Sequence, residues 1–179
     1  MSMVRHFRLT FVAAAIVTIA VPAFAQAPRQ LYNKTVLLNW TTASSQSAPD
    51  GRKFNVTVTA NRTIFVSSAG RLFERASRSV PKGRQQTENA PGATQNAGGE
   101  ATNLRFEGNR LVGHTAFARG AVRFVATFDP SFSSCTLVVR FGREAGGYKM
   151  KGVGGVMYTI DSLVPSGDTC SIRDGNPFG

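Results

Sequence analysis

Few residues in this sequence have the chemistry of a catalyst, and they do not form a recognisable set. Val66–Gly70 contains Ser67 and Ser68 and resembles half of a serine-hydrolase nucleophile elbow, but Val66 stands where the first glycine is required. The histidine available as a base is His114, because His6 belongs to an N-terminal leader. We expect His114 to be a surface residue, and a hydrolase with a site at the mouth of a barrel stays the alternative function.

Carboxylates and glycines give no stronger indication of an enzyme. Glycoside hydrolysis needs two acidic groups at a set separation. The candidates lie mostly at turns or beside arginines, where solvated ion pairs are expected; they are Glu74, Glu107, Asp129 and Asp161. The run Gly152–Gly155 fails the dinucleotide fingerprint, because Met157 stands where the third glycine is needed. We expect no cofactor and no metal site.

Four arginines carry the binding hypothesis, namely Arg105, Arg110, Arg123 and Arg140. The pattern places them on adjacent strands of one solvent-facing side, where they would form a basic patch. The whole chain has 21 basic and 10 acidic residues. A net positive charge of this size favours anionic partners. Solubility alone is the other explanation for it. Anionic lipid or polysaccharide is the expected partner, whereas nucleic acid is not, because the aromatic residues point to the other face.

The segment Leu104–Phe141 must position these arginines, and it predicts four antiparallel strands. A two-residue turn at Gly108-Asn109 pairs Phe106 with Leu111 and Leu104 with Gly113. A second turn at Arg119-Gly120 gives three further pairs: Phe117 with Val122, Thr115 with Phe124, and Leu111 with Phe128. One face then collects the large apolar residues, which are Leu104, Phe106, Leu111, Phe117, Val122, Phe124 and Phe128. Gly113 and Ala126 leave a small gap there, either a ligand cavity or a space filled by neighbouring phenylalanines.

The rest of the chain also predicts short strands. They cover residues 34–42, 54–59 and 62–67, with a turn at Ala60-Asn61 and turn residues over 43–52. Residues 71–76 are either a fourth strand, which we favour, or a short helix. Residues 77–102 are poor in large apolar side chains, which predicts a long mobile loop. A Gly-interrupted strand over 149–160 and the end of regular structure at Leu163–Pro165 are expected to follow, with a flexible tail at 171–179.

The N-terminus predicts export. Arg5 and Arg8 precede an apolar run that is too short to span a bilayer, and Ala23–Ala25 has the small residues of a cleavage site. Cleavage after Ala25 leaves 19 basic and 10 acidic residues, a formal charge of +9. No later transmembrane segment is predicted.

The two cysteines, Cys135 and Cys170, are expected to form one disulfide in an oxidising compartment. Closing that loop would stabilise the fold by about 4 kcal/mol.

These observations predict a periplasmic or secreted protein with a single β domain over residues 26–170. The expected fold is all-β, an up-and-down barrel or a β-sandwich of about eight or nine strands. The expected function is that of a non-enzymatic binding or envelope-associated protein. A carrier of a small hydrophobic ligand is a further alternative. An integral outer-membrane barrel is disfavoured, because Trp and Tyr are few and the faces opposite the phenylalanines carry Arg and Glu.

Overall fold

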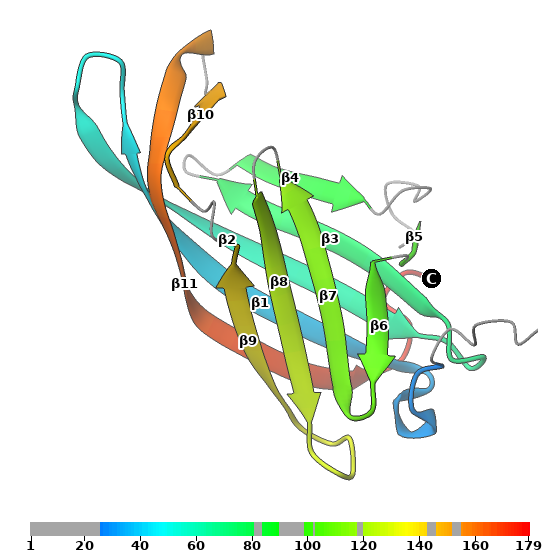
Figure 1. Ribbon diagram of the computed structural model, residues 1–179. Coiled ribbons are helices and arrows are strands. Elements are labelled where there is room, and N and C mark those ends of the chain that lie inside the picture. The colour runs from blue at the N-terminus through cyan, green and yellow to red at the C-terminus, as the bar shows by residue number, and fades with distance from the viewer. Residues whose placement is uncertain are drawn as a thin grey trace, which may run out of the picture.

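Two antiparallel β-sheets make up the computed structural model (Figure 1). It describes residues 26–80, 84–89, 99–101, 103–117, 120–142, 146–151 and 155–179. Sheet A has the order β10 (Tyr148–Lys151), β11 (Met157–Asp174), β1 (Lys34–Ser47), β2 (Lys53–Val66), β3 (Leu72–Val80) and β4 (Arg84–Asn89), with β5 (Gly99–Glu100) on β3. Sheet B has the order β6 (Leu104–Glu107), β7 (Arg110–Phe117), β8 (Gly120–Phe128) and β9 (Cys135–Phe141).

The all-β class is therefore confirmed. The described ranges include a short 3-10 segment, η1 (Arg29–Leu31). No helix among those residues has the length and apolar character needed to cross a membrane. Sheet A curls into a half-barrel, and sheet B lies against its concave side (Figure 1).

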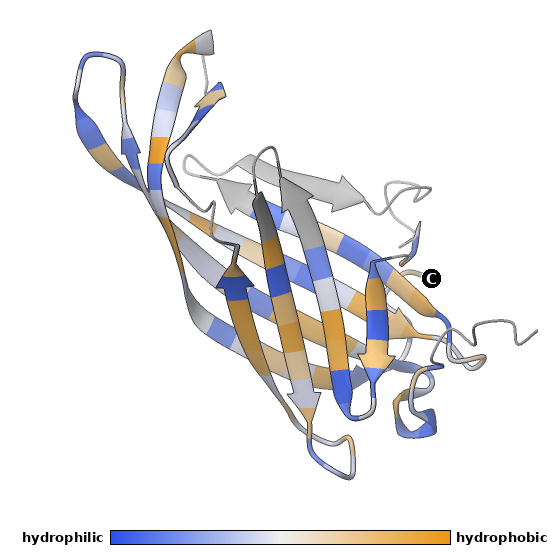
Figure 2. Ribbon diagram, viewed as in Figure 1, coloured by the Kyte–Doolittle hydropathy of each residue, from blue (hydrophilic) through white to orange (hydrophobic). Residues whose placement is uncertain are grey.

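The core fills the space between the two sheets. Sheet A contributes one face of β1 and β2, including the fully buried Leu38, Ile64 and Val66. Sheet B contributes the predicted phenylalanine-rich face, where Phe124 stacks on Trp40 of β1 with ring centroids 5.8 Å apart. Figure 2 shows apolar and polar residues alternating along β6, as expected for a strand with one buried side.

The predicted register holds in the first hairpin of sheet B and shifts in the second. Phe106 pairs with Leu111 and Leu104 with Gly113, as expected. In the β7–β8 pair, however, Thr115 lies opposite Val122 and Leu111 opposite Ala126. The expected pairing was wrong by two residues, and residues 118–119 of that turn lie outside the described residues. Because side chains alternate with a period of two, the shift leaves every side chain on its expected face.

The space beside Gly113 is filled. A Cβ added at Gly113 would overlap the ring of Phe124 and a methyl group of Leu104. This outcome matches the expectation of a gap filled by a neighbouring phenylalanine. The side chain of Phe117, which was assigned to the same face, lies outside the described side chains.

Several boundaries differ from the predicted ones. The long strands β1 and β2 pair without interruption, from Lys34 opposite Val66 at one end to Ser47 opposite Lys53 at the other. The turn expected at Ala60-Asn61 was therefore wrong. Residues 43–47, expected in a turn segment, continue β1. Ser45 and Ser47 are partly exposed, as expected for the solvated face of an antiparallel sheet. Ser44 and Gln46 are buried, and the Gln46 side-chain amide donates a hydrogen bond to the Ser44 hydroxyl across 3.2 Å.

The second half of the chain forms more strand than expected. Residues 77–80 continue β3, and 84–89 form β4 where a loop was predicted; residues 81–83, 90–98 and 102 lie outside the described ranges. The strand predicted over 149–160 is the β10–β11 hairpin instead, and β11 continues to Asp174. The expected flexible tail thus begins in a strand, because residues 171–174 pair with the first residues of β1.

A disulfide links the two sheets. Cys135 of β9 and Cys170 of β11 are bonded, as predicted, with their Cα atoms 5.5 Å apart. Beside it, the Val139 amide donates a hydrogen bond to the Asp168 carboxylate across 3.0 Å. These two links define the seam between the sheets, which is the contact of β9 with β11.

Candidate binding face on sheet B

The outer side of sheet B, named the arginine face below, carries all four predicted binding residues. Strand alternation turns Arg105, Arg110, Arg123 and Arg140 outward, and all four are exposed. Opposite residues of an antiparallel pair share a face, so the pairing register arranges the outward side chains in three rows across the strands. In Figure 1 this side of β6 to β9 faces the viewer, and none of the labelled elements crosses it.

The middle row is apolar apart from Arg105, and the flanking rows are polar. Arg105, Val112, Val125 and Val138 lie in one row across β6 to β9. Val138 leaves 48% of its surface exposed, whereas Val112 is buried beneath its neighbours. On one side of the valines lie Glu107, Arg110, Thr127 and Thr136, and on the other His114, Arg123 and Arg140. Arg123 and Thr127 are four residues apart on β8, which separates the flanking rows by about 13 Å.

The four arginines differ in their partners. Arg105 makes an ion pair with Glu107 on its own strand, with Nη2 and Oε1 2.6 Å apart. Among the described residues, no carboxylate lies within ion-pair distance of Arg110, Arg123 or Arg140. Arg123 and Arg140 are moreover direct cross-strand neighbours. Like charges in that position destabilise a sheet, so this pair needs an explanation other than folding.

A shallow hollow lies between these cations. Its volume is about 440 Å³, and Arg110, Arg123, Val125, Thr127, Val138 and Arg140 line it. Three guanidinium groups surround two partly exposed valines and a threonine hydroxyl. The arrangement offers charged donors around an apolar floor, which suits an anionic ligand that also has an apolar surface.

The predicted catalytic candidates do not come together. His114 is exposed on the arginine face, opposite Arg123. Asp129 bonds residues of its own turn, and Asp161 accepts a hydrogen bond from the Ser47 hydroxyl. Within the described part of the chain, no group of three or more His, Cys, Asp or Glu residues could hold a metal ion.

Glu74 corrects the expectation that the carboxylates form solvated ion pairs. It is buried inside the core with Arg62, and Glu74 Oε1 lies 2.6 Å from Arg62 Nη1. The Arg62 guanidinium also lies 5.4 Å from the centre of the Phe124 ring. The signal was present in the sequence, because Arg62 falls in phase with inward-facing Ile64, and Glu74 in phase with Leu72 and Ala76.

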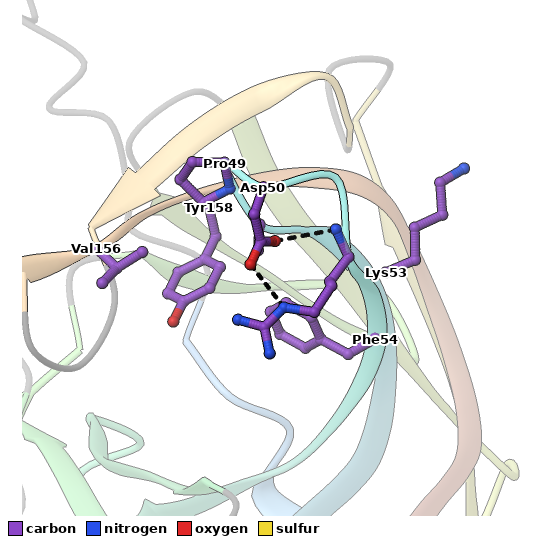
Figure 3. Close-up of a pocket in the computed structure, with 8 residues that line it drawn as sticks. Pro49, Asp50, Lys53, Phe54, Val156 and Tyr158 are labelled. Carbon is purple, nitrogen blue, oxygen red and sulfur yellow. Dashed lines mark hydrogen bonds and ion pairs between the residues drawn. The ribbon is translucent and has the colours of Figure 1, made fainter.

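A second hollow, which the sequence did not indicate, lies where the β1–β2 turn meets the start of β11 (Figure 3). Its volume is about 610 Å³. Phe54 and Tyr158 meet edge to face with centroids 5.3 Å apart. Asp50 accepts hydrogen bonds from the Arg52 backbone N–H and Nε, which lower the pKa of its carboxyl group. Both Asp50 oxygens are thus engaged within the turn.

Comparison with known proteins gives no further indication. No family model, no curated protein and no solved structure matches this chain.

Proposed function

We propose that this chain is an exported, non-enzymatic envelope protein that binds an acidic polysaccharide on the arginine face. The observation that carries the proposal is the adjacent pair Arg123 and Arg140, which has no carboxylate partner among the described residues. Guanidinium groups match carboxylates and phosphates through paired N–H donors. Sugar rings present apolar C–H surfaces, which complement Val125 and Val138. A flat bilayer fits a hollow between side chains less well than a narrow polymer does.

The export part of the proposal rests on the leader and on the disulfide. Cleavage after Ala25 would leave a chain whose second residue, Ala27, is already buried in the core. Disulfides persist in oxidising compartments such as the periplasm. The seam, closed by the disulfide and by the Val139–Asp168 hydrogen bond, supports the view that the two sheets act together as one small barrel.

The test is retention of the mature protein on immobilised polygalacturonate, compared with neutral dextran. In the variant Arg110→Gln/Arg123→Gln/Arg140→Gln we expect apparent affinity to fall at least tenfold, a loss of about 1.4 kcal/mol. Arg105→Gln should have a smaller effect, because Glu107 already neutralises that charge. Retention should also weaken as salt is raised, since the contacts are exposed.

A matched control removes three cations elsewhere. Arg29, Lys34 and Arg173 lie outside sheet B, and their replacement by Gln changes the net charge equally. Equal losses in the two triple variants would reduce the effect to net charge and contradict a specific site. Unchanged retention in the first variant would reject the proposal outright.

A further inference from the structure

One end of sheet A forms a projecting arm, defined here as residues 43–57 of β1 and β2 with 148–151 and 155–164 of β10 and β11. Figure 1 shows it extending beyond the body made by the two sheets. The register keeps its four strand ends side by side, with Lys53 opposite Ser47, Ser47 opposite Thr159, and Thr159 opposite Lys149. This arm has no role in the proposed binding face.

The arm concentrates exposed apolar side chains. Among the described residues, six large hydrophobic side chains are exposed, and the arm carries five of them at 36–56% exposure: Phe54, Met150, Val156, Met157 and Val164. Such clustering marks a surface that meets an apolar phase or a partner. Phe54 and Val156 lie at the outer end of the arm, beside the hollow drawn in Figure 3.

Lysines surround these apolar residues. Lys53 begins β2 and lies at the edge of the hollow drawn in Figure 3, while Lys149 and Lys151 lie on β10. Lys151 is the direct cross-strand partner of Met157. No carboxylate of the described residues lies within ion-pair distance of these three lysines. The arm thus combines exposed apolar tips with long, flexible cations.

We propose that the arm docks end-on into an anionic lipid bilayer. Its exposed tips, Phe54, Val156 and Met157, would enter the interface between headgroups and acyl chains. The three lysines would reach back to lipid phosphates with their long stems along the apolar surface.

The charge on β10 argues against a second copy of this chain as the occupant. β10 is an edge strand of sheet A, and lysines on an edge strand disfavour pairing with another strand. The lysines of two arms brought together would also repel each other. A bilayer with anionic headgroups satisfies both the charges and the apolar tips.

The test is sedimentation of the mature protein with vesicles of equal parts phosphatidylcholine and phosphatidylglycerol, compared with phosphatidylcholine alone. We expect binding to the anionic vesicles only. Replacing Lys53, Lys149 and Lys151 by Gln should weaken it by about fivefold for each lysine. The control with Arg29, Lys34 and Arg173 changed to Gln should bind within twofold of the wild type. Equal weakening in both variants would overturn the proposal.

Insertion is tested separately from attraction. Val156→Ser/Met157→Ser should weaken vesicle binding at least tenfold, whereas Val138→Ser, which removes an exposed valine from sheet B, should not. In Met157→Trp, brominated lipids should quench the new tryptophan and leave Trp40, which is buried in the core, unquenched.

Two further results would overturn the proposal of a membrane-docking arm. One is the absence of quenching at position 157. The other is a dimer in sedimentation velocity that Val156→Ser/Met157→Ser dissociates. A wild-type protein that binds anionic vesicles but is not retained on polygalacturonate would reject the arginine-face proposal and leave the arm proposal intact.

Discussion

Arg62 and Glu74 place an ion pair inside an otherwise apolar core. Their side chains are 8% and 2% exposed, and the Arg62 guanidinium also faces the Phe124 ring. A charge removed from water is costly unless its partner is retained, so the two residues depend on each other. The sequence did not predict this ion pair, because the register between β2 and β3 was not assigned. In that register Glu74 lies opposite Ile64, which is two residues from Arg62 on β2.

Glu74→Gln should destabilise the protein by about 3–5 kcal/mol, because it removes the carboxylate charge that pairs with the buried Arg62 guanidinium. The matched double variant Arg62→Met/Glu74→Leu removes both charges at similar volume and should be close to the wild type in stability. Urea unfolding monitored by Trp40 fluorescence measures both, since Trp40 stacks on Phe124. A loss below about 1 kcal/mol in the single variant would contradict this account.

At the scale of elements, the sequence was most informative where apolar and polar residues alternate strictly. Each described side chain of sheet B to which the sequence assigned a face lies on that face, including the four arginines. The row of valines between them, Val112, Val125 and Val138, was not assigned. Alternation could not distinguish registers that differ by two residues, because such a shift leaves each side chain on the same face of the sheet. The arm was missed because its β1–β2 end is rich in Ser, Ala, Pro and Gly, which resembles a loop until pairing with β10 and β11 is known.

The β8–β9 connection depends on one carboxylate. Asp129 accepts hydrogen bonds from the backbone amides of Ser133 and Ser134, each at 2.7 Å, and also from the Ser131 hydroxyl. Phe132 takes a positive φ of 56° within this turn and is buried, with its ring 5.5 Å from that of Phe128. These hydrogen bonds hold the pKa of Asp129 far below its ordinary value, and the one from the Ser131 hydroxyl contributes more than either of those from the two amides.

This lowered pKa makes a prediction for acid stability. The contribution of Asp129 is complete above its unfolded pKa of about 3.9 and is lost as pH falls towards the lower folded-state pKa. Asp129→Asn should therefore have a lower Tm than the wild type above pH 5, and the difference should shrink below pH 4. Thermal unfolding followed by circular dichroism from pH 2 to 7 measures this. A constant difference across the range would show that the charge is not responsible.

At the scale of the whole molecule, stability depends on how sheet B is held in the curl of sheet A. Among the described strands, no backbone ladder joins the two sheets. The shared apolar core is supplemented at the seam by the disulfide and by the Val139–Asp168 hydrogen bond. The disulfide was predictable because the chain has two cysteines. The hydrogen bond of Asp168 with Val139 was not, because it depends on β9 and β11 being adjacent.

Removing the seam's covalent link should loosen the whole fold rather than one strand. The disulfide closes a loop with a sequence separation of 35 residues, so Cys135→Ser/Cys170→Ser should lose about 4 kcal/mol in the chain-entropy model. Asp168→Ala, which removes the carboxylate that accepts the Val139 hydrogen bond and leaves the disulfide in place, should lose about 1–3 kcal/mol. Chemical denaturation of both variants tests the comparison, with reduction of the wild type expected to reproduce the cysteine variant. A cysteine variant as stable as the wild type would mean that core packing alone holds the sheets together.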